Sequence, residues 1–254
     1  MRLATAQSCF KTLHTKPTAA PSAFRTGLNE LNDLAPGGAF QFGAVHELLW
    51  RPRSVAPGSF ALLLAKAAQT EGGAIVWSDP RRELHPPALA AMGIDLRRLV
   101  LLRCANRSEE LWTLAECLRC RGVSATVAAI EYLSKIEARR LQLAAERGGG
   151  VGVFLRPFNL ATNAHYAAAS RWLVQPAPAE GKPSGAEGKP SGADHGVQRW
   201  SVELLHGHGG RIGQVLLLEV DRGTSSWRAG PPSMRTSAAL ADRSAAPTPA
   251  RATA

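Results

Sequence analysis

Short apolar runs alternate with helical segments along most of this 254-residue chain. Strands are predicted at 43–49, 74–77, 99–102, 125–130 and 151–155. Helices are predicted at 60–69, 87–92, 108–121 and 134–147, each with a glycine within three residues of its end, as is typical of helix C-termini. This alternation predicts an α/β fold with a parallel central sheet. Later strands, predicted at 171–174, 200–205 and 214–220 without helices between them, extend the sheet in antiparallel fashion, the last two as a hairpin.

Segments of biased composition flank and interrupt this core. Residues 176–196 contain EGKPSGA twice in tandem, and such text cannot bury enough apolar surface to fold. Most of the net charge of +10 lies at the two ends, since 1–20 holds three basic and no acidic residues and 222–254 holds five Arg against one Asp. We predict a poorly ordered basic extension at 1–20, a core at 21–221 containing a low-complexity insertion at 176–196, and a disordered basic tail at 222–254. This distribution of charge favours a protein that is tethered to its partners through its basic ends, rather than one that binds nucleic acid in a basic groove on the core.

The compartment follows from what the sequence contains. No apolar run approaches the roughly 18 residues of a membrane span, so we expect no membrane contact. Cys117 and Cys120 form a C-x-x-C pair inside a predicted helix, without a second pair, and are interpreted as ordinary thiols of a reducing cytoplasm. No metal site is predicted, because His195, His206 and His208 fall in flexible Gly-rich text.

Ligands of parallel α/β sheets bind where the strands end, which places the candidate site in the loops that follow the strands. A phosphate-binding version of this fold has a Gly-rich first loop with Lys before Ser or Thr. Here residues 50–59 contain one Gly, two Pro and no Lys before Ser59. Arg51, Arg53, Gly58 and Ser59 are the candidates for contacting a nucleotide phosphate, and solvated loop charges are the alternative interpretation of the two arginines.

The order of these motifs resembles a known family. Thr26-Gly-Leu28, Gly37-Gly38 and the strand at 43–49, followed by a loop and an Ala-rich helix, resemble the opening of RecA-type recombinases. Within that superfamily the chain resembles the ImuA family over about 24–221, apart from the insertion. The segments that carry this narrower resemblance are Gly43–Leu49, Glu110-Leu-Trp112, Arg139–Glu146 and Gly209–Gly213 before Glu219-Val-Asp221.

The resemblance implies a RecA-like core, of the P-loop NTPase type, with a degenerate Walker A loop. It also implies an accessory role in SOS-induced translesion DNA synthesis, beside an inactive Y-family polymerase partner (ImuB) and an error-prone C-family polymerase. The recombinase RecA and DNA are further candidate partners. Such a protein would be cytoplasmic and associated with the nucleoid.

Two carboxylates match positions that serve catalysis in that superfamily. Glu131 follows a strand where a Walker B Asp stands, and Glu109 is matched to the carboxylate that activates water. An acidic residue serving a helix N-terminus accounts for Glu109 equally well. We therefore expect a non-catalytic protein without a cofactor, with ATP and Mg²⁺ as the alternative.

The loop at 156–165 occupies the place of a recombinase's mobile DNA-binding loop. Its candidate DNA contacts are Arg156, Phe158, Asn159, Asn163 and His165, which supply phosphate donors and one base-stacking ring. A plain connector remains the other interpretation, because the loop is short. Trp112, Trp172 and Trp200 are predicted to be core residues. The function predicted from all this is a scaffold of mutagenic DNA synthesis, with a DNA-stimulated ATPase and a charge-driven DNA-binding protein as alternatives.

Overall fold

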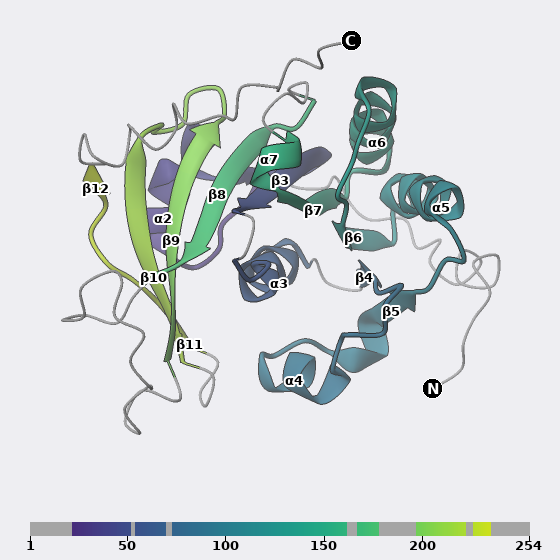
Figure 1. The fold of residues 1–254 in the computed structure, drawn as a ribbon, viewed down its shortest axis with the longest axis horizontal. Helices are drawn as coiled ribbons and strands as arrows, with labels where there is room; N and C mark the ends of the chain where they lie inside the picture. The colour runs from purple at the N-terminus through teal and green to yellow at the C-terminus, as the bar shows by residue number, and fades with distance from the viewer. Residues whose placement is uncertain are drawn as a thin grey trace, which may run out of the picture.

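The computed structural model describes residues 22–51, 54–69, 73–161, 167–177, 197–221 and 226–234. Within these residues, ten strands form one sheet in the order β11-β10-β9-β8-β3-β7-β6-β4-β5, with β12 paired to β10 (Figure 1). The strands of this sheet are β3 (Ala44–Trp50), β4 (Ala74–Ser78), β5 (Leu99–Leu102), β6 (Val123–Ala129), β7 (Val151–Pro157), β8 (Ser170–Pro176), β9 (Val197–His206), β10 (Gln214–Asp221), β11 (Ser226–Ala229) and β12 (Ser233–Met234). A separate antiparallel pair joins β1 (Ala23–Phe24) to β2 (Phe40–Gln41). The helices are α2 (Asn29–Leu34), α3 (Gly58–Ala68), α4 (Pro86–Ala91), α5 (Arg107–Arg119), α6 (Lys135–Gly148) and α7 (Phe158–Ala161).

The sheet is parallel at its centre and antiparallel toward the chain's end, as predicted. Strand β3 pairs in parallel with β7 and β8, and β6 pairs in parallel with both β7 and β4. Strand β9 pairs antiparallel with β8 on one side and with β10 on the other, and the predicted hairpin joins Leu216 to Val202. The first strand of the large sheet in chain order, β3, therefore lies inside this sheet with a neighbour on each side.

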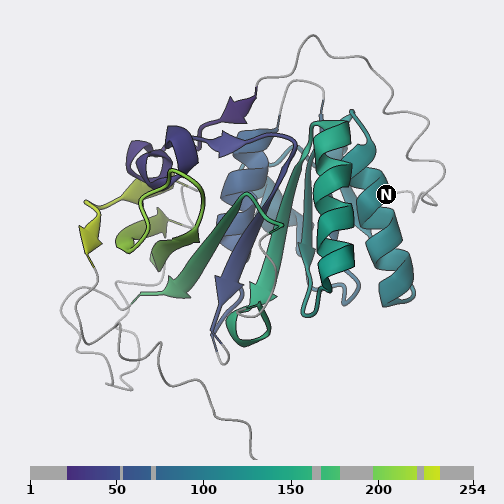
Figure 2. The ribbon, with the colours of Figure 1, turned by 90° about the horizontal axis from the view of Figure 1, so that it is seen from above.

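Helices cover both faces of this parallel centre (Figure 2). Helix α3 packs on one face, where Leu48 of β3 joins the largest apolar cluster. Helices α5 and α6 lie side by side on the opposite face, where Val45 of β3 packs against Leu114 and Leu141. Because successive residues of a strand point to opposite faces, a strand covered on both sides must be apolar at nearly every position. That requirement explains the continuous apolar runs of the sequence.

Local signals fix the ends of the helices on the α5–α6 side. The Ser134 side chain caps α6 and Glu137 closes a capping box with it. The chain leaves α6 at Gly149, whose φ of 80° is a left-handed conformation that glycine adopts without strain. Helix α5 begins one residue before the predicted Ser108, because the Asn106 side chain accepts the amide of Glu109 and acts as the cap.

The structure tests the three tryptophans predicted to be core residues and the predicted start of the C-terminal tail. Trp172 and Trp200 are fully buried, as predicted, but Trp112 is 48% exposed and belongs to the surface. The strand-forming part of the chain extends beyond 221, since β11 and β12 pair with β10 inside the segment predicted as a disordered tail. Residues 1–20, residues 178–196 of the predicted insertion and the tail from 235 onward lie outside the described residues.

The structure also places the C-x-x-C cysteines and shows the lengths of the helices. Cys117 and Cys120, at the end of α5, are buried and pack in an apolar cluster with Val76 and Val123. No helix in the described part of the chain has the length and apolar character needed to cross a membrane.

Candidate functional site

The loop between β3 and α3 occupies the place of a phosphate-binding loop, at the carboxyl end of an inner parallel strand. Gly58 and Ser59 are the first residues of α3, and Pro57 precedes them as a cap that offers no side-chain hydrogen bond. The Gly58 amide donates to the Ala56 carbonyl at 2.8 Å, and the Ser59 hydroxyl donates to Gln198 Oε1 of β9 at 3.3 Å. These two donors at the start of α3 are thus engaged within the protein.

The structure describes one of the two arginines predicted to contact a nucleotide phosphate. Arg53 lies outside the described residues. Arg51 lies over the ring of Phe158, with its guanidinium carbon 5.5 Å from the ring centroid, a cation–π contact. The structure therefore brings together one candidate of the predicted nucleotide loop and one of the predicted DNA loop.

Arg156 has a role that differs from the prediction. It is the sixth residue of β7, is 1% exposed, and its Nη1 donates to Glu47 Oε1 at 2.7 Å. Glu47 Oε2 also accepts from Arg171 Nε at 2.8 Å. The prediction that Arg156 contacts DNA is replaced by a buried ion pair, because the side chain points to a face of the sheet that is covered.

The other candidates of that loop are split between the surface and the fold. Phe158 is half-buried on α7 and packs against Leu49, Ala161 and Leu173. Asn159 is exposed on the same short helix. Asn163 and His165 lie outside the described residues, so of the five candidates the structure leaves Asn159 as the exposed one among those it describes.

The two carboxylates matched to catalytic positions lie apart in the sheet order. Glu109 Oε2 accepts the amide of Ala105 at 2.9 Å, which ties it to the start of α5. Glu131 follows β6, is exposed, and forms an ion pair with Arg81 at 3.3 Å. Strand β4 lies between β6 and the β5 strand that precedes α5. The helix-terminus interpretation of Glu109 agrees with these contacts.

Buried acidic residues, among them Glu47 and Asp79, were not predicted from the sequence. Glu47 stands at the centre of the apolar strand β3, and a carboxylate in such a run needs a buried cation. Asp79 follows β4 and is 4% exposed, and its Oδ1 accepts the amides of Glu83 and Leu84. Asp79 Oδ2 lies 3.8 Å from Arg103. The signal in both cases is an acidic residue in or directly after a buried strand.

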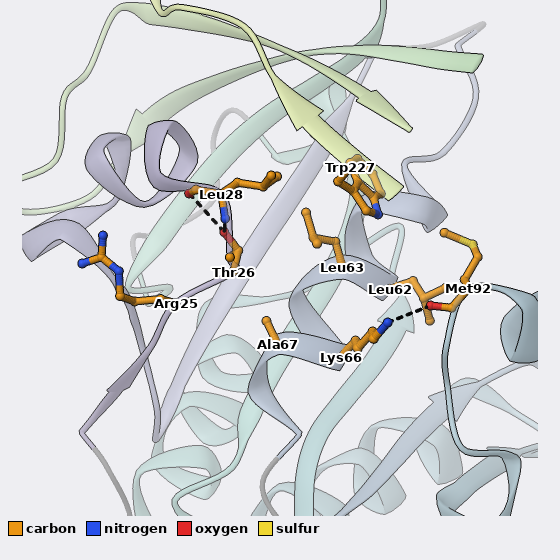
Figure 3. Close-up of a pocket in the computed structure, with 10 residues that line it drawn as sticks. Arg25, Thr26, Leu28, Leu62, Leu63, Lys66, Ala67, Met92 and Trp227 are labelled. Carbon is orange, nitrogen blue, oxygen red and sulfur yellow. Dashed lines mark hydrogen bonds between the residues drawn. The ribbon is translucent and has the colours of Figure 1, made fainter. Parts of the chain in front are cut away.

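A cavity of about 490 Å³ lies on the outer side of α3 (Figure 3). Arg25 and Thr26 line one side, Lys66 of α3 and Met92 after α4 line another, and Trp227 of β11 lies beside Leu63. The Lys66 ammonium donates to the Met92 carbonyl at 3.2 Å. These residues come from distant parts of the chain, so the sequence alone could not assemble them.

The comparisons with known proteins agree with this fold. No family model matches the chain. Curated proteins named "Protein ImuA" from two strains of Caulobacter vibrioides are each 34% identical to it over 224 residues, covering 83% of this chain and 87% of theirs. The crystal structure of the RadB recombinase superposes with a TM-score of 0.56 at 14% identity, covering 79% of this chain and 97% of that one. The fold is therefore RecA-like, and the identity and coverage show that this chain belongs to the ImuA family.

Proposed function

We propose that this protein is an accessory factor of SOS-induced translesion DNA synthesis that works through protein contacts. Its direct partner would be an inactive Y-family polymerase of the ImuB kind, with an error-prone C-family polymerase in the same complex and the recombinase RecA as a further partner. Membership of the ImuA family supports the cellular role. We also propose that the protein is not an enzyme, and that it works beside the nucleoid.

The observation that supports a non-catalytic role is the state of the β3–α3 loop. A working phosphate loop holds free backbone amides and a Lys near the start of the helix. Here the Gly58 amide and the Ser59 hydroxyl already have protein partners, and residues 50–59 contain no Lys. A phosphate bound at the start of α3 would compete with both hydrogen bonds and would lack the compensating charge of a Lys. Protein contacts therefore explain this site better than turnover of ATP.

The experiment is a co-purification of the full-length chain with the ImuB homologue of the same organism, combined with damage-induced mutation frequency in a strain lacking the gene. We expect stable co-purification, and equal restoration of mutagenesis by the wild type and by Ser59→Ala. A wild-type chain that restores mutagenesis but binds no ImuB homologue would refute the proposed partner. ATP turnover that disappears in Glu109→Gln would instead favour the ATPase alternative.

A further inference from the structure

Helix α6 carries a groove of about 750 Å³ on the side turned away from the sheet. Its aliphatic lining residues are Ile136, Leu143 and Ala167. Among the residues that the structure describes, its lining includes no acidic side chain and five basic ones: Arg119, Lys135, Arg139, Arg140 and Arg147. We call these eight residues the α6 groove.

The apolar part of the α6 groove is not explained by the fold. Helix α6 packs on the sheet through Leu141, Ala144 and Ala145, which are buried. Ile136 and Leu143 are seven residues apart and so form a second apolar stripe on the helix. Ile136 is 81% exposed, and a helix with one core-facing side ordinarily carries polar residues at such positions.

An adjoining hollow extends the same surface onto α5. A pocket of about 420 Å³ lies between the first turns of α5 and α6, where Trp112 and Leu111 line it together with Arg140. Arg140 thus stands between the α6 groove and the half-exposed indole of Trp112. Exposed aromatic and aliphatic side chains next to arginines have the composition of interface centres.

The charge of the α6 groove is only partly balanced by the protein itself. Arg119 pairs with Glu116, and Arg139 lies 3.8 Å from Glu146. Among the residues that the structure describes, Lys135, Arg140 and Arg147 form no ion pair. Three such cations beside exposed aliphatic side chains are complementary to a ligand that carries carboxylates beside apolar side chains.

We propose that the α6 groove and the adjoining Trp112 pocket form a docking surface for an acidic amphipathic segment of a partner protein. Leucine-like side chains of that segment would bury Ile136 and Leu143, and its carboxylates would pair with Lys135, Arg140 and Arg147. A nucleic acid fits less well, because a phosphate backbone buries no aliphatic surface. The inference deepens the proposed function, on which it rests, by naming the surface that holds a partner.

The surface is stiff enough to act as a docking site. The capping box of Ser134 and Glu137 orders the first turn of α6, directly beside Lys135 and Ile136. Arg107 of α5 binds the same Glu137 carboxylate through both of its terminal nitrogens, each at 2.9 Å. The two helices are therefore held together at the end where the α6 groove and the Trp112 pocket meet, which lowers the entropy that a partner must overcome.

The test uses the full-length chain and a fluorescent acidic probe peptide of about 20 residues with leucines at helical i, i+3, i+4 and i+7 spacing. A scrambled peptide of the same composition and a single-stranded oligonucleotide serve as second and third probes. The test variant is the double substitution Ile136→Asp and Arg140→Glu, both at exposed sites. The matched control is Arg211→Glu with Ile212→Asp, which changes one exposed Arg and one exposed Ile far along the chain.

We expect the wild type and the control to bind the amphipathic probe at least about tenfold more tightly than the scrambled one, and the test variant to lose that preference. The inference is overturned if the wild type binds both peptides equally, or if the test and control variants bind the amphipathic probe equally. Loss of oligonucleotide binding alone in the test variant also overturns it and assigns the surface to nucleic acid. If the test variant keeps full co-purification with the ImuB homologue, the docking surface fails while the proposed function stands.

Discussion

Arg107 and Glu137 join the first turns of α5 and α6 through a two-armed ion pair, with Nη1 to Oε1 and Nη2 to Oε2 both at 2.9 Å. Glu137 Oε2 also accepts the amide and the hydroxyl of Ser134, each at 2.8 Å. One carboxylate thus caps its own helix and binds the neighbouring one. The hydrogen bond from Arg107 is the main cause that lowers the pKa of Glu137 to about 2.

Replacing Glu137 by Gln should therefore weaken both the cap and the link between the helices. We expect a loss of about 1 kcal/mol in the free energy of unfolding, a modest value because the pair is partly exposed to solvent. Urea unfolding monitored by circular dichroism measures it. Arg97→Ala is the control, since Arg97 pairs with Asp95 on the surface and should change stability by much less. Equal losses in the two variants would contradict the joint role of Glu137.

His46 should make the stability depend on pH. It is 2% exposed, its Nε2 donates to the Gln41 carbonyl at 3.0 Å, and its Nδ1 accepts from the Ser170 hydroxyl at 2.7 Å. Burial lowers the pKa of His46 from 6.5 to about 4. The unfolded chain therefore binds a proton more readily than the folded one between these values, so stability is complete above the unfolded pKa and falls as the pH drops toward the folded one.

The size of this effect follows from the shift. Between pH 7 and about pH 5, His46 should account for a loss of about 2 kcal/mol in the free energy of unfolding. Urea unfolding at both pH values, in the wild type and in His46→Gln, isolates this share because other titrating groups are common to both proteins. A variant that loses as much stability on acidification as the wild type would show that His46 is not the sensor.

At Gly148 the backbone of α6 lies close to the backbone of α5. A Cβ atom built there would lie 1.9 Å from the Leu118 carbonyl oxygen and 2.8 Å from the Arg119 Cα, so the backbone would have to move. We expect Gly148→Ala to destabilise the protein by about 2 to 3 kcal/mol. Gly149→Ala is the comparison, because its site is open and only the positive φ opposes it, at a cost of about 1 kcal/mol. Thermal unfolding of both variants measures the two losses, and a larger loss of stability in Gly149→Ala than in Gly148→Ala would contradict the prediction.

The layout of the fold could be predicted from the sequence because its signals are local. Apolar runs bounded by glycines predict the strands and helices, and a run such as Ala74–Trp77 that is apolar at every position predicts a strand covered on both faces, as β4 is. The exposure of Trp112 could not be predicted in this way. Its position on α5 depends on how α5 and α6 pack against each other, which no window of sequence contains.

The candidate site was predictable in place but not in detail. The missing Lys before Ser59 is visible in the sequence, whereas the hydrogen bond from Ser59 to Gln198 joins residues 139 positions apart. The prediction that Arg156 contacts DNA is wrong for the same reason. Its partner Glu47 lies on another strand, and only the register of β3 against β7 brings their side chains together.

The state of the β3–α3 loop predicts the outcome of a nucleotide titration. Because the Gly58 amide and the Ser59 hydroxyl are engaged, we expect no saturable binding of a fluorescent ATP analogue with Mg²⁺, and the same flat response from Ser59→Ala. Equilibrium fluorescence of the full-length chain is the measurement. Saturable binding by the wild type that Ser59→Ala or Arg51→Ala removes would show that the loop rearranges to hold a phosphate.

The buried charges of Glu47, Arg156 and Arg171 predict the largest single effect on stability. Glu47 accepts from both guanidiniums, so Glu47→Gln removes the carboxylate charge that both of these buried cations share. We expect a loss of about 3 to 5 kcal/mol in the free energy of unfolding. Glu219→Gln is the matched control, since its pair with Arg199 is partly open to solvent and should cost no more than about 1 kcal/mol.

Arg156 itself separates the structural role from the predicted DNA contact. Arg156→Gln should destabilise the protein by about 3 kcal/mol, because it leaves Glu47 short of a cation in a buried site. Affinity for single-stranded DNA, measured by fluorescence anisotropy under conditions where the variant stays folded, should not change. A variant as stable as the wild type that has lost DNA affinity would mean that the Arg156 guanidinium leaves Glu47 to meet the nucleic acid.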